Sequence, residues 1–189
     1  MYAIPLDDTG AELRPLEPWH AEEFLAHLDR GREFIGRFIP FGSQVTDVDS
    51  ARATLQRYAD LRAADKASHH GIWSDGTLVG GVLTLEFDAA SGNCEVGCWL
   101  EPAASGRGLI TRAMRHLIDW AVEDRGIHRV EWVAASGNVP SLKVAERLGF
   151  TRDGIRREAH QWRGERHDLE VWSVLAPEWR SARDAHKKR

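Results

Sequence analysis

Cysteine is scarce in this chain of 189 residues, which contains only Cys94 and Cys98. Both fall in one predicted strand, where a separation of four residues places their α-carbons about 13 Å apart. A disulfide requires α-carbons within about 7 Å. The sequence therefore predicts free thiols, as is usual in the cytoplasm. A Cys-x₃-Cys pair without a second ligand pair also gives no reason to expect zinc or another metal.

Long hydrophobic runs and an excess of basic residues are also missing. No apolar stretch reaches the roughly 18 residues of a membrane-spanning helix, and residues 1–8 have neither the basic start nor the apolar core of a signal peptide. Asp and Glu (29) outnumber Lys and Arg (25), which gives a formal charge of −4. General nucleic-acid binders carry a basic excess. We therefore expect a cytoplasmic protein with neither a membrane nor a nucleic-acid partner.

The remaining composition is that of a globular protein, with 42% hydrophobic and 29% charged residues. A chain of this length corresponds to one domain. We predict a single domain over residues 1–176. Residues 177–189 are polar, end in Lys187-Lys188-Arg189, and are expected to form a tail.

Hydrophobic periodicity alternates between the helical and the extended pattern along the chain. Helices are predicted over residues 18–29, 47–65, 109–125 and 138–148, and strands over residues 12–16, 70–73, 78–87, 95–100, 130–133, 150–157 and 169–175. Asp75-Gly76 indicates a hairpin turn. Residues 31–45 are expected to be irregular. The sum is an α+β fold in which about four helices flank a mixed sheet of about seven strands, interrupted by one strand–loop–helix crossover.

A glycine-rich turn, Ser105-Gly106-Arg107-Gly108, joins a predicted strand to the third predicted helix. Glycines let the backbone approach a ligand closely, and a helix N-terminus offers free N–H groups and a partial positive charge to an anion. A tight turn without a ligand is the alternative interpretation. A Walker loop is excluded because no Gly-Lys-Ser/Thr follows, and a dinucleotide fingerprint lacks its third glycine at Thr111.

Five segments together resemble the GNAT acyltransferases and, more closely, their RimJ/RimL-like branch. They are Phe38-Ile39-Pro40-Phe41, Glu95-Val96-Gly97-Cys98-Trp99-Leu100, Ser105–Thr111, Asn138-Val139-Pro140-Ser141 and Leu148-Gly149-Phe150. The resemblance covers roughly residues 10–176. It implies the GNAT fold and the transfer of an acetyl group from acetyl-CoA to a primary amine by direct attack in a ternary complex. A protein N-terminal α-amine is the acceptor it favours; an antibiotic, polyamine or amino acid is the alternative.

The resemblance also implies which residues bind the cofactor. They are Trp99, Leu100, Ser105, Gly106, Arg107, Gly108, Leu109, Ile110, Thr111, Asn138 and Ser141. A free backbone N–H near Leu100 would polarise the thioester carbonyl, and Ser141 would lie near the leaving thiolate. Ser141 and Asn138 are equally common as plain helix-start residues. Two positions depart from the family pattern, Ser105 in place of Arg or Gln and Ile110 in place of Gly or Ala.

Glu95 is the candidate general base, because a glutamate within an apolar strand is unusual. Glu86, Glu131 and His160 are rivals, and pairing of Glu95 with solvent or an arginine is the alternative. The acceptor is expected to contact Glu95 and the aromatic residues Phe34, Phe38 and Phe41, with Trp99, Trp162 and Trp172 as further candidates for the cleft. Cys98 is expected to be an inert packing residue.

Tyrosine is scarce as well, and this leaves a second class of function open. Many family members place a tyrosine proton donor near the fourth helix, whereas this chain has only Tyr2 and Tyr58. A non-catalytic acyl-CoA-binding module, or an interaction domain whose glycine turn holds no ligand, are therefore alternatives to the enzyme. The sequence also leaves open a homodimer.

Overall fold

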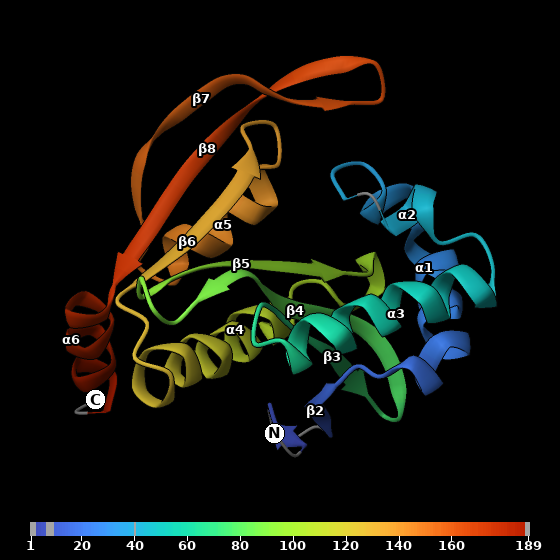
Figure 1. Ribbon diagram of the computed structural model, residues 1–189, viewed down its shortest axis with the longest axis horizontal. Helices are drawn as coiled ribbons and strands as arrows, with labels where there is room; N and C mark the ends of the chain where they lie inside the picture. The colour runs from blue at the N-terminus through green and yellow to red at the C-terminus, as the bar shows by residue number, and fades with distance from the viewer. Residues whose placement is uncertain (1–2, 7–9, 40, 188–189) are drawn as a thin grey trace.

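A computed structural model describes residues 3–6, 10–39 and 41–187 and shows one mixed sheet with helices on both faces (Figure 1). The strand order is β1-β2-β3-β4-β5-β6-β8-β7. The strands are β1 (Ile4–Pro5), β2 (Ala11–Pro15), β3 (Ser68–Ser74), β4 (Thr77–Asp88), β5 (Asn93–Leu100), β6 (Arg129–Ala135), β7 (Thr151–Trp162) and β8 (Glu165–Leu175). The α-helices are α1 (Ala21–Ile35), α2 (Phe41–Gln44), α3 (Val48–Ala63), α4 (Leu109–Asp119), α5 (Val139–Arg147) and α6 (Ala176–Lys187). Short helical segments are η1 (Pro18–His20), η2 (Pro102–Ala104) and η3 (Trp120–Asp124).

The predicted α+β class and mixed sheet are confirmed, and so are several residues predicted to begin or end helices and strands. Asp47 caps α3 by accepting a hydrogen bond from the backbone N–H of Ser50 (2.7 Å), as the sequence predicts. Asp75-Gly76 makes the β3–β4 turn, and Gly149, at φ +87°, follows α5. The described part of the chain has eight strands and six α-helices rather than about seven and four, because β1, α2 and α6 were not predicted.

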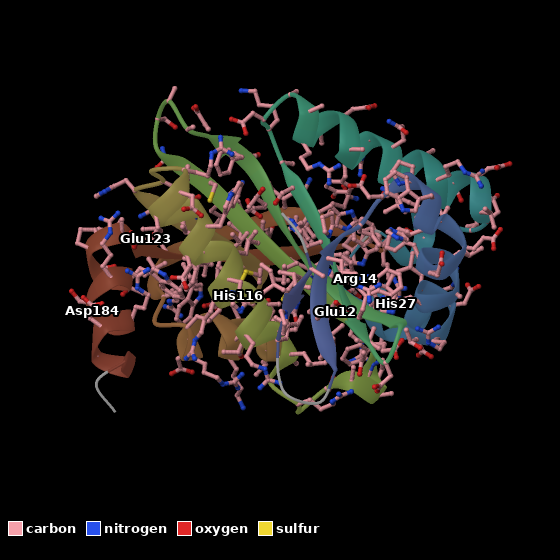
Figure 2. The ribbon with its side chains drawn as sticks, turned by 90° about the horizontal axis from the view of Figure 1, so that it is seen from below. Glu12, Arg14, His27, His116, Glu123 and Asp184 are labelled. Carbon is pink, nitrogen blue, oxygen red and sulfur yellow. The ribbon has the colours of Figure 1, made fainter. Side chains whose placement is uncertain are left out.

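Two segments differ from the prediction. Residues 31–35 continue α1, and this last turn buries Gly31 and places Ile35 in the core around Phe24. The expected tail instead contains α6, in which buried Trp179 donates a hydrogen bond to Asp119 of α4 (2.7 Å). Figure 2 shows α6 beside the labelled Glu123, which pairs with arginines of α6.

Two hydrophobic cores lie on opposite faces of the sheet. One joins the sheet to α4, α5 and α6, and its largest fully buried side chain is Trp132. The other joins it to α1, α2 and α3 around Phe24. Leu83 and Phe87 belong to different cores although an even spacing normally keeps two strand residues on one face. A β-bulge at Glu86, whose φ is +46°, changes the alternation there.

Candidate functional site

The strands β5 and β6 separate in the middle of the sheet. They form its parallel pair, joined through α4, and they are in register only from Asn93↔Arg129 to Glu95↔Glu131. Both strands continue, β5 to Leu100 and β6 to Ala135, without further pairing to each other. A crossover point of this kind, where two adjacent parallel strands part, is a common ligand site in mixed sheets.

The backbone N–H of Leu100 faces this opening. The N–H of the next residue, Glu101, donates to the carbonyl of Val79 on the side of β4 (2.9 Å). Successive N–H groups of a strand point to opposite edges, so that of Leu100 points toward β6. The geometry therefore offers the hydrogen-bond donor that the sequence predicts near Leu100.

The glycine turn follows β5 and lies between η2 and α4. Gly106 and Gly108 have φ values of +80° and +73°, which favour glycine. Gly108 is the N-cap of α4 and, lacking a side chain, leaves the first N–H groups of the helix to other partners. A β-carbon at Gly108 would lie 3.0 Å from Nη1 of Arg112. Because neither glycine carries a side chain, the backbone of the turn is open to an anion such as the pyrophosphate of acetyl-CoA.

In the cofactor candidates at the start of α4, the side chains are buried and the backbone N–H groups are what a ligand can reach. Leu109, Ile110 and Thr111 are buried, so that only their N–H groups are available to a ligand. Ile110, the departure from the family pattern, packs in the core around α4. Arg107 donates to Ser74 Oγ (3.1 Å) and so is directed toward the β3–β4 hairpin.

Ser141 and Asn138 lie where α5 begins, beside β6. Nε1 of buried Trp132 donates to Ser141 Oγ (3.0 Å), so the hydroxyl proton of Ser141 stays available for a second partner. Asn138 is the N-cap of α5 but makes no capping hydrogen bond with its side chain. The plain helix-capping interpretation therefore does not explain Asn138.

Glu95 stands where β5 and β6 begin to separate. Burial, reinforced by the nearby carboxylates Glu86 and Glu131 and opposed by Arg156, raises the pKa of Glu95 to about 7. Glu131 is held by Arg129 (2.7 Å), which also bonds Asp153. A pKa of about 7 suits a general base at neutral pH, which agrees with Glu95 as the candidate.

The structure separates the remaining candidates. His160 lies toward the tip of the β7–β8 hairpin, stacked on Trp162 with ring centroids 6.2 Å apart. Nε1 of Trp162 donates to the backbone carbonyl of Arg37 (3.1 Å), so the hairpin tip reaches the segment after α1 (Figure 1). Trp172 packs against the core that contains α5 instead.

The aromatic candidates near α1 are only partly ligand-facing. Phe41 and Trp99 are 6% and 3% exposed, and their rings pack edge to face at 5.5 Å in the core. Their spacing therefore marks a buried face, and the binding roles of Phe41 and Trp99 stay predictions. Phe34 is 46% exposed and lines a cavity of about 570 Å³ with Arg30, Arg37 and Pro102. Phe38 is half-buried. Pro40 of the same motif is outside the described residues.

Sequence reasoning missed a buried polar network between α1 and the end of β5. His27 has no exposed surface; its Nδ1 lies 3.2 Å from Glu101, and its Nε2 accepts from Nε1 of Trp99 (3.0 Å). Arg30 also bonds Glu101 (3.0 Å). The network joins the wall of the cavity to the residue that follows Leu100. A single histidine on a helix gives no sequence signal for it.

Both cysteines are free thiols, as predicted. Burial raises the pKa of each thiol to about 12, so neither is a thiolate at neutral pH. Among the described residues, no cluster of His, Cys, Asp and Glu is arranged to hold a metal, and no helix has the length and apolarity to cross a membrane.

Comparisons with known proteins agree with this geometry. The family model "Acetyltransferase (GNAT) domain" matches residues 11–151. A Bacillus subtilis protein named "Putative ribosomal N-acetyltransferase YdaF" is 33% identical over 88% of this chain and 92% of its own length. A crystal structure of a "Probable acetyltransferase" superposes with a TM-score of 0.88 at 29% identity, covering 95% of this chain and 99% of the other. The ribosomal L7/L12 alpha-N-protein acetyltransferase RimL, in complex with coenzyme A, shares the fold with a TM-score of 0.86 at 20% identity, covering 92% and 97%.

Proposed function

The chain belongs to the GNAT family of acetyl-CoA-dependent N-acetyltransferases, and we propose that its acceptor is the N-terminal α-amine of a protein. The observation that carries the proposal is the separation of β5 from β6 directly after a glutamate whose pKa is raised to about 7. The name of the similar Bacillus subtilis protein, which specifies ribosomal acetylation, supports the choice of a protein acceptor.

The glycine turn and the start of α4 are the residues we assign to the pyrophosphate of acetyl-CoA. The N–H groups of residues 106–111 supply the hydrogen bonds, since the side chains of Leu109, Ile110 and Thr111 are buried. Asn138, whose side chain does not cap α5, is assigned to the pantetheine arm. Acetyl-CoA supplies an acetyl group activated as a thioester.

Glu95 removes the proton that prevents an ammonium group from attacking. An α-amine has a pKa of about 7.7–8.0, close enough to that of Glu95 for proton transfer, directly or through water. The free amine attacks the acetyl carbonyl, a C–N bond forms, and the C–S bond breaks. The N–H of Leu100 stabilises negative charge on the carbonyl oxygen.

Ser141 stabilises the sulfur that leaves. Its hydroxyl accepts from Trp132, which fixes the oxygen and leaves the proton free to point at a thiolate. This role compensates for the missing tyrosine donor in the sequence. The acetylated nitrogen then loses its second proton, which protonates the departing thiolate, and Glu95 releases the first proton to solvent, so that each turnover releases one proton.

The acceptor side combines acidic and basic groups. Glu86, Glu95 and Glu131 interact electrostatically and attract the ammonium group. Arg30, Arg32 and Arg37 line the cavity beside Phe34 together with Asp29 and Glu33. Arg30 pairs with Glu101 and Arg32 with Asp29, so Arg37 is the cation that we assign to an acidic residue in the body of a peptide. We therefore expect an acceptor with a free N-terminus and an acidic residue among the positions that follow it.

Thiol release from acetyl-CoA tests the function directly. Peptides that begin with Ser or Ala, polyamines, free amino acids and aminoglycosides are assayed with the same protein preparation. We expect thiol release with the peptides, and more when acidic rather than basic residues follow the N-terminal residue. Release with small amines alone would overturn the protein acceptor. If no acceptor gives thiol release while coenzyme A still binds, the result would support a non-catalytic module.

Two further expectations accompany the proposal. We propose that the protein works in the cytoplasm, which the free state of Cys94 and Cys98 supports. A homodimer stays a prediction, which sedimentation velocity at several protein concentrations tests.

A further inference from the structure

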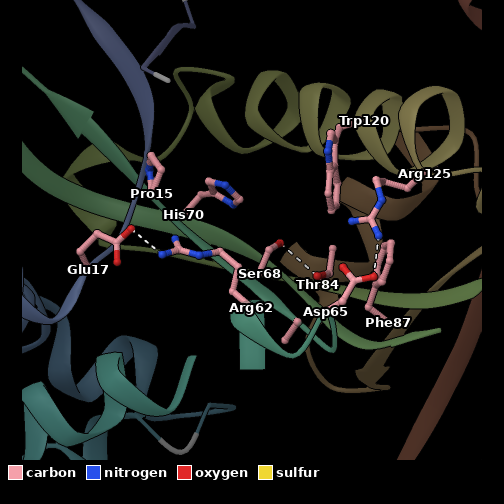
Figure 3. A pocket seen from close by; sticks show the side chains of 11 residues that line it. Pro15, Glu17, Arg62, Asp65, Ser68, His70, Thr84, Phe87, Trp120 and Arg125 are labelled. Carbon is pink, nitrogen blue, oxygen red and sulfur yellow. Dashed lines mark hydrogen bonds and ion pairs between the residues drawn. The ribbon is translucent and has the colours of Figure 1, made fainter. Parts of the chain in front are cut away.

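A second cavity, of about 350 Å³, lies at the other end of α4 from the glycine turn (Figure 3). Trp120, on its wall, is twelve residues after Gly108, which corresponds to about 18 Å along a helix. Its floor comes from β3 and β4, on the face of the sheet that α4 covers. This cavity is therefore separate from the site assigned to acetyl-CoA.

The floor of the cavity carries polar groups that the fold does not satisfy. His70 is 4% exposed, and its Nδ1 has no hydrogen-bond partner in the part of the chain that the structure describes. Burial, with Arg62 nearby, lowers the pKa of His70 to about 4, so the ring is neutral. Beside it Ser68 Oγ and Thr84 Oγ1 lie 3.0 Å apart. Their one shared hydrogen bond leaves one hydroxyl proton to donate.

The mouth of the cavity holds two arginines. Arg62 pairs with Glu17 (2.7 Å) and Arg125 with Asp65 (2.6 Å), each through a single terminal nitrogen. A guanidinium has five N–H donors, so both retain donors for a further partner, whereas each carboxylate already has a cation beside it. The lining therefore offers more hydrogen-bond donors than acceptors.

The remaining wall is aromatic. Phe87 and Trp120 are stacked, with ring centroids 5.5 Å apart and an angle of 29° between the rings. The guanidinium of Arg125 lies 4.8 Å from the Phe87 ring and 5.2 Å from the Trp120 ring, which holds it over them. Figure 3 shows His70 and Trp120 directed toward the same space. A ligand here meets the guanidinium of Arg125 and the ring of Trp120 on one wall, and Arg62 and the polar floor elsewhere in the cavity.

We propose that this cavity binds a small carboxylate molecule. Arg62 and Arg125 hold the carboxylate at the mouth of the cavity. The oxygens at the other end of the molecule, on the cavity floor, bond the hydroxyl groups of Ser68 and Thr84 and the ring of His70. Trp120 covers the hydrocarbon part. The volume is at the small end of the range for ligand pockets, about 300–1,000 Å³, which suits a metabolite rather than a peptide.

Fluorine NMR of protein labelled with 5-fluorotryptophan tests the site by a local signal. The chain has eight tryptophans, and the resonance that disappears in Trp120→Phe is that of Trp120. Citrate, glutarate and inorganic phosphate are titrated separately, with coenzyme A at saturation so that the main site is filled. We expect citrate or glutarate to shift the Trp120 resonance in a saturable way at millimolar concentration, while the Trp132 resonance stays unchanged.

Matched variants keep the proposal falsifiable. Arg62→Gln should weaken carboxylate binding at least tenfold, and Ser68→Ala should weaken it several-fold. Arg52→Gln is the control, because Arg52 lies on the same helix and pairs with exposed Asp49 outside the cavity. A linear shift with every anion, binding of phosphate alone, or equal affinity in Arg62→Gln and Arg52→Gln would overturn the proposal. None of these readouts depends on acetyl transfer.

Discussion

Glu95 links activity to stability at the scale of a single residue. A carboxyl whose pKa is raised to about 7 is favoured as the neutral acid in the folded state. Glu95→Gln keeps a neutral side chain of the same shape but cannot accept the proton. We expect its turnover to fall about a hundredfold, in the range of general-base contributions, with the affinity for coenzyme A unchanged. The wild-type rate should rise with pH through an apparent pKa near 7, and a Glu95→Gln variant that keeps both the normal rate and this pH dependence would reassign the base.

The same substitution should stabilise the fold at high pH. Because the folded-state pKa is raised, ionising Glu95 costs the native state stability as pH rises from about 4.5 to about 7. Glu95→Gln removes this cost, which is at most about 3 kcal/mol at pH 8 for a shift of this size. Urea denaturation at pH 5 and pH 8 measures it: the variant should gain several times more stability at pH 8 than at pH 5. A gain of the same size at both pH values would contradict the assignment.

Ser141 provides the second prediction at this scale. Ser141→Ala removes the hydroxyl that accepts from Trp132 and that we assign to the leaving thiolate. We expect kcat to fall about a hundredfold, the lower end of the range for the loss of one charge-stabilising hydrogen bond, with little change in the KM for acetyl-CoA. Ser141→Thr retains the hydroxyl and should recover most of the rate. Equal rates for the two variants would leave Ser141 as a helix-start residue.

At the scale of elements, the start of α4 depends on a glycine. Gly108→Val forces a β-carbon into a backbone with φ +73° and to within 3.0 Å of Arg112. We expect at least a tenfold loss of affinity for coenzyme A, measured by isothermal titration calorimetry. Gly92→Val is the control, since Gly92 has the same φ of +73° in the β4–β5 turn. Similar losses in both variants would point to general strain instead of a cofactor cradle.

The tip of the β7–β8 hairpin supplies a further prediction. Trp162→Phe keeps an aromatic ring beside His160 but loses the hydrogen bond to the carbonyl of Arg37. The hairpin then has a weaker contact with the segment after α1. We expect the KM for peptide acceptors to rise three- to tenfold, with the KM for acetyl-CoA unchanged. A parallel change in both constants would refute a role confined to the acceptor side.

Local signals explain which elements could be predicted. Asp47, Asp75-Gly76 and Gly149 act within a few residues, and the sequence predicts the elements that they bound. The extension of α1 past Gly31 accompanies burial of Ile35 in the core around Phe24, and α6 accompanies the hydrogen bond from Trp179 to Asp119, sixty residues away. Contacts of that separation leave no pattern in a single sequence.

The same reasoning applies to the site. Its backbone parts, the glycine turn and the strand end at Leu100, follow from a motif whose geometry is local. The side chains of Phe41 and Trp99 do not, because helical or strand spacing is the same for a core face as for a binding face.

At the scale of the whole molecule, buried histidines set the response to acid. Burial lowers the pKa of His27 and His70 to about 4 and that of His69 to about 3. The unfolded chain binds protons at these side chains from about pH 6.5 downward, before the folded chain does. Stability therefore rises with pH between about 4 and 6.5. Glu95 acts in the opposite direction over part of this window, so the three histidines outweigh it by about two protons.

A substitution of His69 tests the contribution of a single histidine to this pH dependence. Its ring nitrogens have no hydrogen-bond partner among the described residues, and it lies in an aromatic cage, 4.3 Å from the Tyr58 ring and 4.9 Å from that of Trp99. His69→Leu fills this space without a titrating group. We expect the slope of unfolding free energy against pH, measured in urea between pH 4 and 6.5, to fall by about one proton, or about 1.4 kcal/mol per pH unit. If His69→Leu leaves the slope unchanged, the acid sensitivity resides in His27, His70 or the carboxylates, and the cage around His69 already admits a proton in the folded state.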